Sequence, residues 1–217
     1  MPPSFDRIAR PYRWLEYLTF GPMLERCRFH FLPELKDARH ALVFGDGDGR
    51  FLARLLAADE LLHADAVDFS PAMLRLLRDR ASRLEALDRI TLHCADARTF
   101  NPPGVYDLVA THFFLDCFTT AELHSLSASI CPRLLPGALW VVSEFAVPSG
   151  AMSIPAKCLV WSLYTAFRIL TGLRVRRLPD HSAVLASAGL SCIAQRRRLG
   201  GLLVSEVWEY PGNQDRR

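Results

Sequence analysis

Short apolar runs alternate with amphipathic stretches along the first two thirds of the chain. The runs lie at 41–44, 63–69, 89–96, 106–114 and 138–145, and their length is typical of strands. The stretches at 50–58, 71–87 and 119–135 place apolar residues three and four positions apart, as helices with one buried face do. Largely apolar strands separated by helices indicate a parallel sheet covered on both sides. The pattern therefore predicts a doubly wound α/β fold.

The end of the chain breaks this alternation. A helix is expected at 179–189, and two further strands at 191–199 and 202–210 flank Gly200 and Gly201. Paired glycines between two such runs predict a hairpin. The last strand should therefore run antiparallel to its neighbour within a single domain that spans residues 1–217.

The first apolar run leads directly into a loop with three evenly spaced glycines, Gly45, Gly47 and Gly49. Glycines between a strand and a helix let a nucleotide approach the main chain closely. The third glycine of a dinucleotide-binding GxGxxG motif would fall at Arg50, and the GxxxxGK[ST] loop of NTPases is absent from the sequence. Asp46 and Asp48 would repel a pyrophosphate, whereas they would not repel a cationic sulfonium ligand.

Two further acids end the next two strands. Asp68 follows Gly45 by 23 residues, and an acid at this place can accept both ribose hydroxyls of a nucleoside. Asp96 ends the third strand, where an ionised carboxylate suits the donor amine of adenine. The glycine loop and these two acids predict a nucleoside site at the carboxyl edge of the sheet.

In this order and spacing the motifs resemble those of class I S-adenosylmethionine-dependent methyltransferases, in particular the small-molecule group that includes the ubiquinone/menaquinone C-methyltransferases. The matching segments are FDRIARPY (5–12), VFGDGDGRF (43–51), VDFSPAML (67–74), CADA (94–97), YDLV (106–109) and LLPGALWVVSE (134–144). The resemblance implies a seven-stranded Rossmann-like sheet of order 3-2-1-4-5-7-6, an N-terminal cap at 1–36 and a lid insertion at about 148–178. One departure is Val43, because the family usually has an acid two residues before the first glycine.

The resemblance also implies S-adenosyl-L-methionine as the cofactor, with S-adenosyl-L-homocysteine as its product. The residues expected to bind it are Tyr12, Gly45, Asp46, Gly47, Gly49, Asp68, Phe69, Met73, Asp96, Ala97, Thr111 and His112.

Substrates of this fold meet the methyl group near the end of the fourth strand, where His112 and Asp116 are the acid/base candidates. Methyl transfer from a sulfonium often needs no strong base, because alignment alone can supply about 7–11 kcal/mol. The residues expected to contact the substrate are Trp14, Phe114, Trp161, Tyr164 and Arg168. The last three share a helix face, which suits a flat or apolar acceptor that bears an anionic or carbonyl group.

Composition narrows the class of partner. A net charge of +3 is too weak to indicate nucleic acid. Dispersed cysteines and histidines, without CxxC or HExxH spacing, argue against a metal site. The apolar segment 152–173 is interrupted by Lys157 and Arg168, so we expect a buried or amphipathic helix there, not a membrane span. Peripheral contact with a membrane stays open.

The sequence thus predicts a cytoplasmic methyltransferase that acts on a small, fairly apolar acceptor by in-line methyl transfer. Two alternatives remain. One is methylation of RNA or another macromolecule, which the arginines at 174–177 and 196–198 would serve. The other is a catalytically inactive cofactor-binding module, which Val43 and the acidic glycine loop suggest.

Overall fold

The computed structural model describes residues 20–147 and 178–211. Seven strands form one sheet: β1 (His40–Phe44), β2 (His63–Asp68), β3 (Ile90–Cys94), β4 (Tyr106–His112), β5 (Leu134–Phe145), β6 (Ser191–Arg198) and β7 (Leu203–Tyr210). Their order is β3-β2-β1-β4-β5-β7-β6. Strands β1 to β5 pair in parallel, and β7 is antiparallel to both of its neighbours. The predicted fold class and strand order are confirmed.

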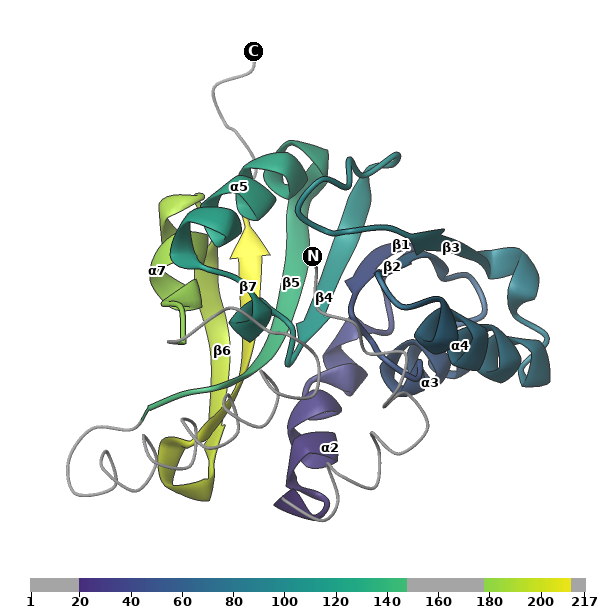
Figure 1. Ribbon diagram of the computed structural model, residues 1–217, viewed down its shortest axis with the longest axis horizontal. Coiled ribbons are helices and arrows are strands. Elements are labelled where there is room, and N and C mark those ends of the chain that lie inside the picture. Colours follow the sequence, from purple (N-terminus) through teal and green to yellow (C-terminus); the bar gives the residue numbers. More distant parts are fainter. Residues whose placement is uncertain (1–19, 148–177, 212–217) are drawn as a thin grey trace.

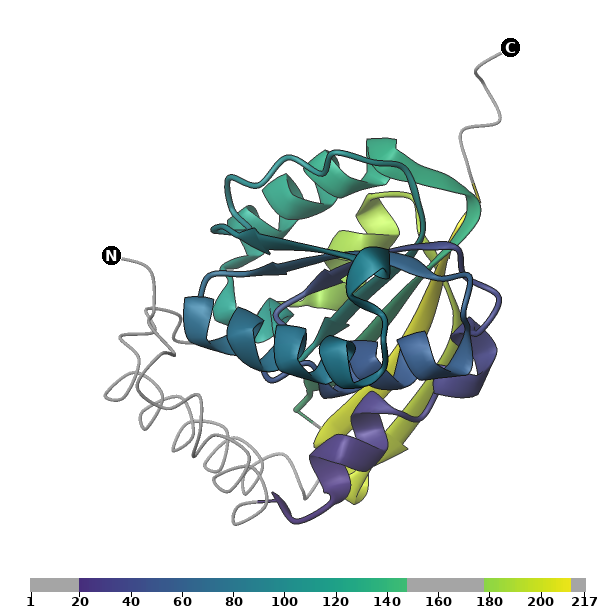
Figure 2. The same ribbon diagram turned by 90° about the vertical axis from the view of Figure 1, so that its right-hand side faces the viewer.

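Helices cover both faces of the sheet (Figures 1 and 2). Helices α5 (Thr120–Ile130) and α7 (His181–Ser187) lie on one face, and α2 (Met23–Arg28), α3 (Arg50–Ala58) and α4 (Pro71–Arg83) lie on the other. Short 3-10 turns complete the connections: η1 (Leu32–Leu35), η2 (Leu87–Arg89), η3 (Leu115–Cys117), η4 (Cys131–Arg133) and η6 (Leu199–Gly201). Within residues 20–147 and 178–211, no helix has the length and hydropathy needed to cross a bilayer.

Side-chain caps define where the helices begin. The Ser70 hydroxyl accepts a hydrogen bond from the Met73 amide at 3.2 Å, as expected for the start of α4. Thr119 and Glu122 form a reciprocal capping box at α5. Helix α4 ends at Arg83, four residues before the predicted boundary, and Leu84 is consequently exposed.

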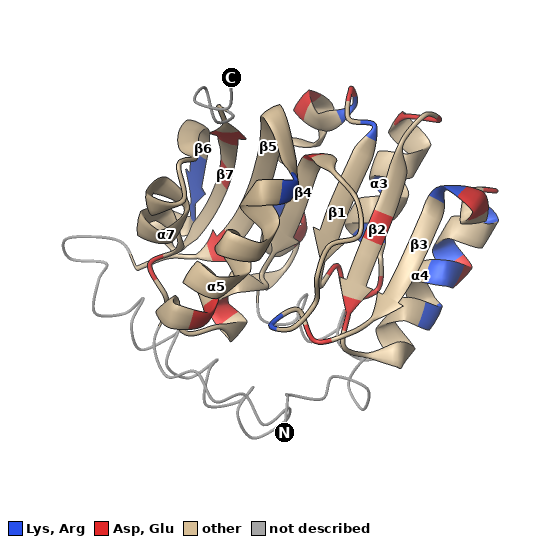
Figure 3. Ribbon diagram, turned by 90° about the horizontal axis from the view of Figure 1, so that it is seen from above, with Lys and Arg blue, Asp and Glu red and all other residues tan. Residues whose placement is uncertain are grey.

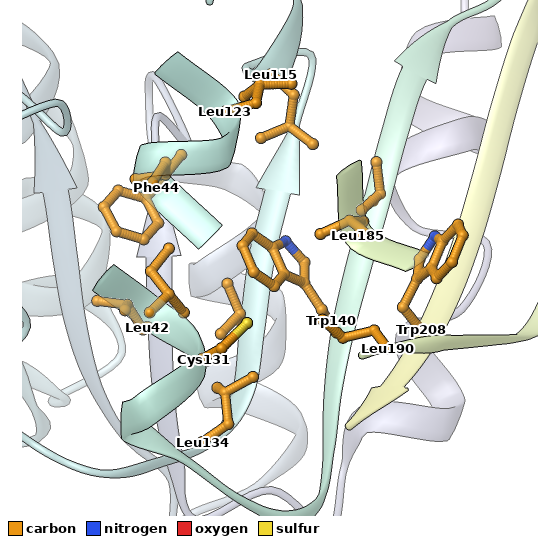
Figure 4. Packing of buried hydrophobic residues seen from close by; sticks show 14 of the residues in the cluster. Leu42, Phe44, Leu115, Leu123, Cys131, Leu134, Trp140, Leu185, Leu190 and Trp208 are labelled. Atoms are coloured by element: carbon orange, nitrogen blue, oxygen red, sulfur yellow. The ribbon is translucent and has the colours of Figure 1, made fainter. Parts of the chain in front are cut away.

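Two large apolar clusters, and a smaller one between α2 and β7, fill the space between the sheet and its helices. One joins the sheet to α5 and α7, and Figure 4 shows Trp140 and Leu185 facing each other within it. The other packs the apolar face of α3 against β1 and β4. Val43, for which the resemblance implied an acid, is fully buried in this second cluster. The two larger clusters pack the parallel strands between the helices on either face, with the carboxyl ends of the strands at a common edge.

The predicted hairpin is confirmed. Strands β6 and β7 pair on either side of η6, where Gly200 adopts a positive φ of 63°. From the predicted N-terminal cap at 1–36, the structure describes α2 and η1. Almost all of the predicted lid at 148–178 lies outside the described residues.

Candidate active site

A cleft opens at the carboxyl ends of the parallel strands. Its empty volume is about 880 Å³, including the open mouth. Most of the described residues that the sequence pointed to lie around it: Gly45, Asp46, Gly47, Asp68, Phe69, Met73, Asp96, Ala97, His112 and Phe114. Parallel α/β sheets bind their ligands at this edge.

The three glycines of the loop after β1 have different roles. All have positive φ, from 59° to 79°. A side chain on Gly45 would collide with the Phe114 ring, and a Cβ on Gly49 would lie 2.8 Å from the Cα of Leu77 on α4. Gly49, which does not line the cleft, therefore serves the packing of α3 against α4. A Cβ on Gly47 would have no atom of the described residues within 4 Å, so this glycine leaves the described part of the cleft open.

Both aspartates of the loop are held by the protein itself. The Asp46 carboxylate accepts hydrogen bonds from the Phe51 and Leu52 amides at 3.2 and 2.9 Å and so caps α3. Burial raises its pKa to about 6, against the opposing charge of Arg28.

Asp48 is neutralised by two arginines. Its oxygens lie 2.8 Å from Nε of Arg50 and 2.6 Å from Nη2 of Arg80, which reaches over from α4. The expected repulsion of a pyrophosphate by this loop is therefore weaker than the sequence suggested. The case against a dinucleotide rests on the glycine spacing.

Asp68 and Asp96 each begin a turn as well as lining the cleft. The Ser70 amide donates to Oδ1 of Asp68 at 2.8 Å. The backbone amide and guanidinium of Arg98 donate to Oδ1 of Asp96 at 3.0 and 3.2 Å, and the same guanidinium pairs with Glu122. These local bonds hold both carboxylates in place at the ends of β2 and β3.

His112 lies at the end of β4 and is 3% exposed. Its Nδ1 is 2.9 Å from the Ser143 hydroxyl of β5, and its Nε2 has no hydrogen-bond partner among the described residues. Burial, and secondarily the charge of Arg28, hold its pKa well below the usual value. The ring is therefore neutral at physiological pH.

The backbone after His112 is strained and then pinned. Phe113 has a φ of +54°, which is rare for a residue with a side chain. The buried Glu144 accepts hydrogen bonds from the amides of Phe114 and Leu115 at 3.0 and 2.7 Å. Burial and the neighbouring Asp116 raise the pKa of Glu144 well above its ordinary value. This arrangement stacks the Phe114 ring against Phe44 on the floor of the cleft.

Some predicted site residues are not brought into the cleft. Thr111 is buried in the core, where it accepts a hydrogen bond from the Trp140 indole at 3.0 Å. Asp116 does not line the cleft; it is half-buried beside Cys117, and burial raises its pKa to about 6. The other predicted residues lie outside the described part of the chain: Tyr12, Trp14, Trp161, Tyr164 and Arg168.

Sequence reasoning missed several lining residues, of which Arg28 is the most informative. Its side chain, from α2, is 5% exposed, lines the cleft, and lies 5.8 Å from the centre of the Phe113 ring. One indication of it was present in the sequence: within RCRFHF (26–31), Arg28 lies next to Cys27 and three residues before Phe31, which are both buried. The others are Arg50, Val67, Ala95, Arg98, Phe113, Cys117 and Phe118, whereas Asp48 was expected near the ligand only as a repelling charge.

The sheet order defines a Rossmann-like fold, and its cleft brings together the glycine loop and the acids after β2 and β3. Residues 41–137 match the family model of a methyltransferase domain. This match covers less than half of the chain, and membership of the class I S-adenosylmethionine-dependent methyltransferases remains the prediction made from its motifs. The ubiquinone-like subgroup stays a prediction.

Solved structures share this fold, and a curated relative is similar to part of the chain. An O-methyltransferase family protein from Burkholderia thailandensis superposes with a TM-score of 0.68 at 16% identity, over 96% of this chain and 63% of its own. The N-methyltransferase NodS from Bradyrhizobium japonicum, in complex with S-adenosyl-L-homocysteine, gives 0.64 at 16% identity, over 87% and 88%. Polyamine aminopropyltransferase 2 from Bacillus cereus is 30% identical over an alignment 108 residues long, which covers 43% of this chain and 29% of that protein. The chain thus spans under two thirds of the first structure and under a third of the curated relative.

Proposed function

We propose that this chain transfers the methyl group of S-adenosylmethionine to a small, fairly apolar acceptor. The observation that carries the proposal is the convergence of Gly47, Asp68 and Asp96 on one cleft. A glycine that leaves the main chain accessible and an acid for the ribose hydroxyls suit a nucleoside at this edge of the sheet. The fold shared with NodS, whose structure holds the demethylated product, supports the same assignment.

The cleft residues fit this cofactor. Asp68 would accept from the ribose hydroxyls, and Asp96 with Ala97 would contact the adenine. Gly47 leaves the main chain accessible. Arg28 places a buried positive charge in the cleft, which suits the carboxylate at the amino-acid end of the molecule.

The chemistry needs little from the protein beyond placement. When bound, the cofactor supplies an electrophilic methyl group: the acceptor atom bonds to the methyl carbon while the carbon–sulfur bond breaks and its electron pair stays on sulfur. Met73, Phe114 and Phe118 give the cleft an apolar wall, which excludes water and favours an apolar acceptor. The N-terminal segment and the insertion after β5 would complete the cover, as proposed from the sequence.

The aminopropyl transfer named by the Bacillus relative is a competing reaction. A sulfonium donor of an aminopropyl group has no carboxylate at the end of that chain. The buried guanidinium of Arg28 in the cleft therefore favours S-adenosylmethionine over such a donor.

The RNA alternative has less support from the described surface. Arg196 and Arg197 are exposed on β6, the edge strand farthest from β3 in the sheet order. Figure 3 shows this basic strand separated from the β1–β3 end of the sheet by β7, β5 and β4. A substrate held there would not reach the cleft directly.

Calorimetry with matched ligands tests the proposal. We expect S-adenosylmethionine and S-adenosylhomocysteine to bind, decarboxylated S-adenosylmethionine to bind more weakly, and NAD not to bind. A preference for the decarboxylated compound would favour aminopropyl transfer instead. Transfer of a labelled methyl group to a panel of small phenols and amines then separates an enzyme from a binding module, because the module would bind the cofactor without turnover.

A further inference from the structure

A buried polar network connects the cleft to α2 and to two strands of the sheet. At its cleft end lies His112, a lining residue whose Nε2 is buried and has no hydrogen-bond partner among the described residues. At its other end, the Cys27 carbonyl on α2 accepts hydrogen bonds from the hydroxyls of Ser143 on β5, at 3.2 Å, and Ser205 on β7, at 2.8 Å. Ser143 lies between the two ends, because its hydroxyl oxygen is also 2.9 Å from Nδ1 of His112.

Counting hydrogens along this network assigns the histidine tautomer. A serine hydroxyl has one hydrogen, and a carbonyl oxygen can only accept. When that hydrogen is directed to the Cys27 carbonyl, Ser143 can only accept from His112, and Nδ1 carries the ring hydrogen. A neutral imidazole has one N–H, which leaves a lone pair on Nε2. The reverse arrangement, in which Ser143 donates to Nδ1, would place the ring hydrogen on Nε2 as a buried N–H with no partner among the described residues.

The surroundings keep this ring neutral. Burial and the charge of Arg28 both oppose a second proton on His112 and lower its pKa. His112 is therefore better suited to accept a hydrogen bond than to hold a proton taken from a substrate. A bound molecule that offers no donor to Nε2 would leave a buried acceptor unsatisfied, which disfavours its binding.

We propose that Ser143 is a positioning residue that fixes His112 as the Nδ1–H tautomer, so that Nε2 accepts a hydrogen bond from an O–H or N–H group of the methyl acceptor. This inference rests on the proposed function and narrows its substrate class. Hydroxyl compounds and amines that carry a hydrogen would be accepted, whereas ethers, thioethers and tertiary amines would not.

Nitrogen-15 NMR of the histidine rings tests the tautomer without any turnover. We expect the wild-type protein to carry the ring hydrogen on Nδ1 of His112, assigned by the loss of its signals in His112→Gln. Ser143→Ala should move that hydrogen toward Nε2, because the acceptor at Nδ1 is gone. Ser205→Ala is the matched control: it removes the other hydroxyl on the Cys27 carbonyl and should leave the hydrogen on Nδ1. A wild-type ring protonated at Nε2 would overturn the proposal, even if neither variant folds.

A pair of small ligands tests the acceptor class. In the complex with S-adenosylhomocysteine, phenol should shift the Nε2 resonance of His112, whereas anisole, its methyl ether, should not. Equal shifts with both compounds, or none with phenol, would refute the donor requirement. A shift caused by S-adenosylhomocysteine alone would assign the hydrogen bond to the cofactor's amino group and refute it as well. Calorimetric binding of S-adenosylhomocysteine is measured on the same sample, so failure of the underlying function is recognised separately.

Discussion

Replacing Asp68 by alanine tests the proposed ribose acceptor. The variant loses a carboxylate that would receive hydrogen bonds from the ribose, and a hydrogen bond to a charged group contributes about 1.5–3 kcal/mol. Taking ~2 kcal/mol, and a factor of ten for each ~1.4 kcal/mol, the Kd for S-adenosylhomocysteine should rise roughly 30-fold. Isothermal titration calorimetry measures this change directly.

Asp68 also has a structural role, and the control must separate the two. Its carboxylate accepts from the Ser70 amide just before α4, so Asp68→Ala should also destabilise the fold. Ser70→Ala removes the neighbouring cap, the bond from the Met73 amide, at a cost of about 1 kcal/mol in unfolding free energy. We expect Ser70→Ala to lower the melting temperature while leaving the Kd nearly unchanged. If Asp68→Ala binds as tightly as wild type, or if both variants lose affinity equally, Asp68 is not the ribose acceptor.

Two further predictions concern the glycine loop. Gly47→Val should abolish calorimetric binding of S-adenosylhomocysteine, because the new side chain would occupy the cleft. Gly137 also has a positive φ, with no described atom within 4 Å of an added Cβ, but it lies on β5, so the control variant Gly137→Val should bind normally. The pKa of Asp46 is raised to about 6 in the folded protein from an ordinary value near 3.8. The folded state therefore binds a proton at Asp46 more tightly than the unfolded state does. The contribution of Asp46 to the unfolding free energy should decrease as pH rises from about 4 to 6. Urea denaturation across this range should show a smaller decrease for Asp46→Asn than for wild type; equal pH dependence would contradict the assignment.

The fold was predictable because its signals are local and repeat along the chain. Apolar runs, the Ser70 cap and the Gly200–Gly201 turn each act within a few residues, and together they specify the alternating architecture. The boundary of α4 was placed too late because the helical apolar spacing continues to Leu84, whereas the structure ends the helix at Arg83 and leaves Leu84 exposed.

Only those cleft residues that belong to a sequence motif could be predicted. Gly47, Asp68 and Asp96 stand at strand ends, so topology brings them together. Arg28 and the ion pair between Asp48 and Arg80 belong to no motif. Their positions depend on how α2 and α4 pack against the sheet. Thr111 was misjudged for a related reason: alternation along β4 turns it toward the core, while its neighbour His112 faces the cleft.

The described contacts also give the C-terminal strands a part in the site, although the matched methyltransferase domain ends at residue 137. Strand β7 contributes Ser205, whose hydroxyl binds the Cys27 carbonyl, and Leu203, which packs with Leu24 and Cys27 on α2. A buried carbonyl that loses its donors costs about 1–3 kcal/mol, so this anchor fixes α2 firmly against the sheet. Arg28 is the next residue after Cys27. The hairpin of β6 and β7 therefore holds the Arg28 guanidinium in place, although neither strand lines the cleft.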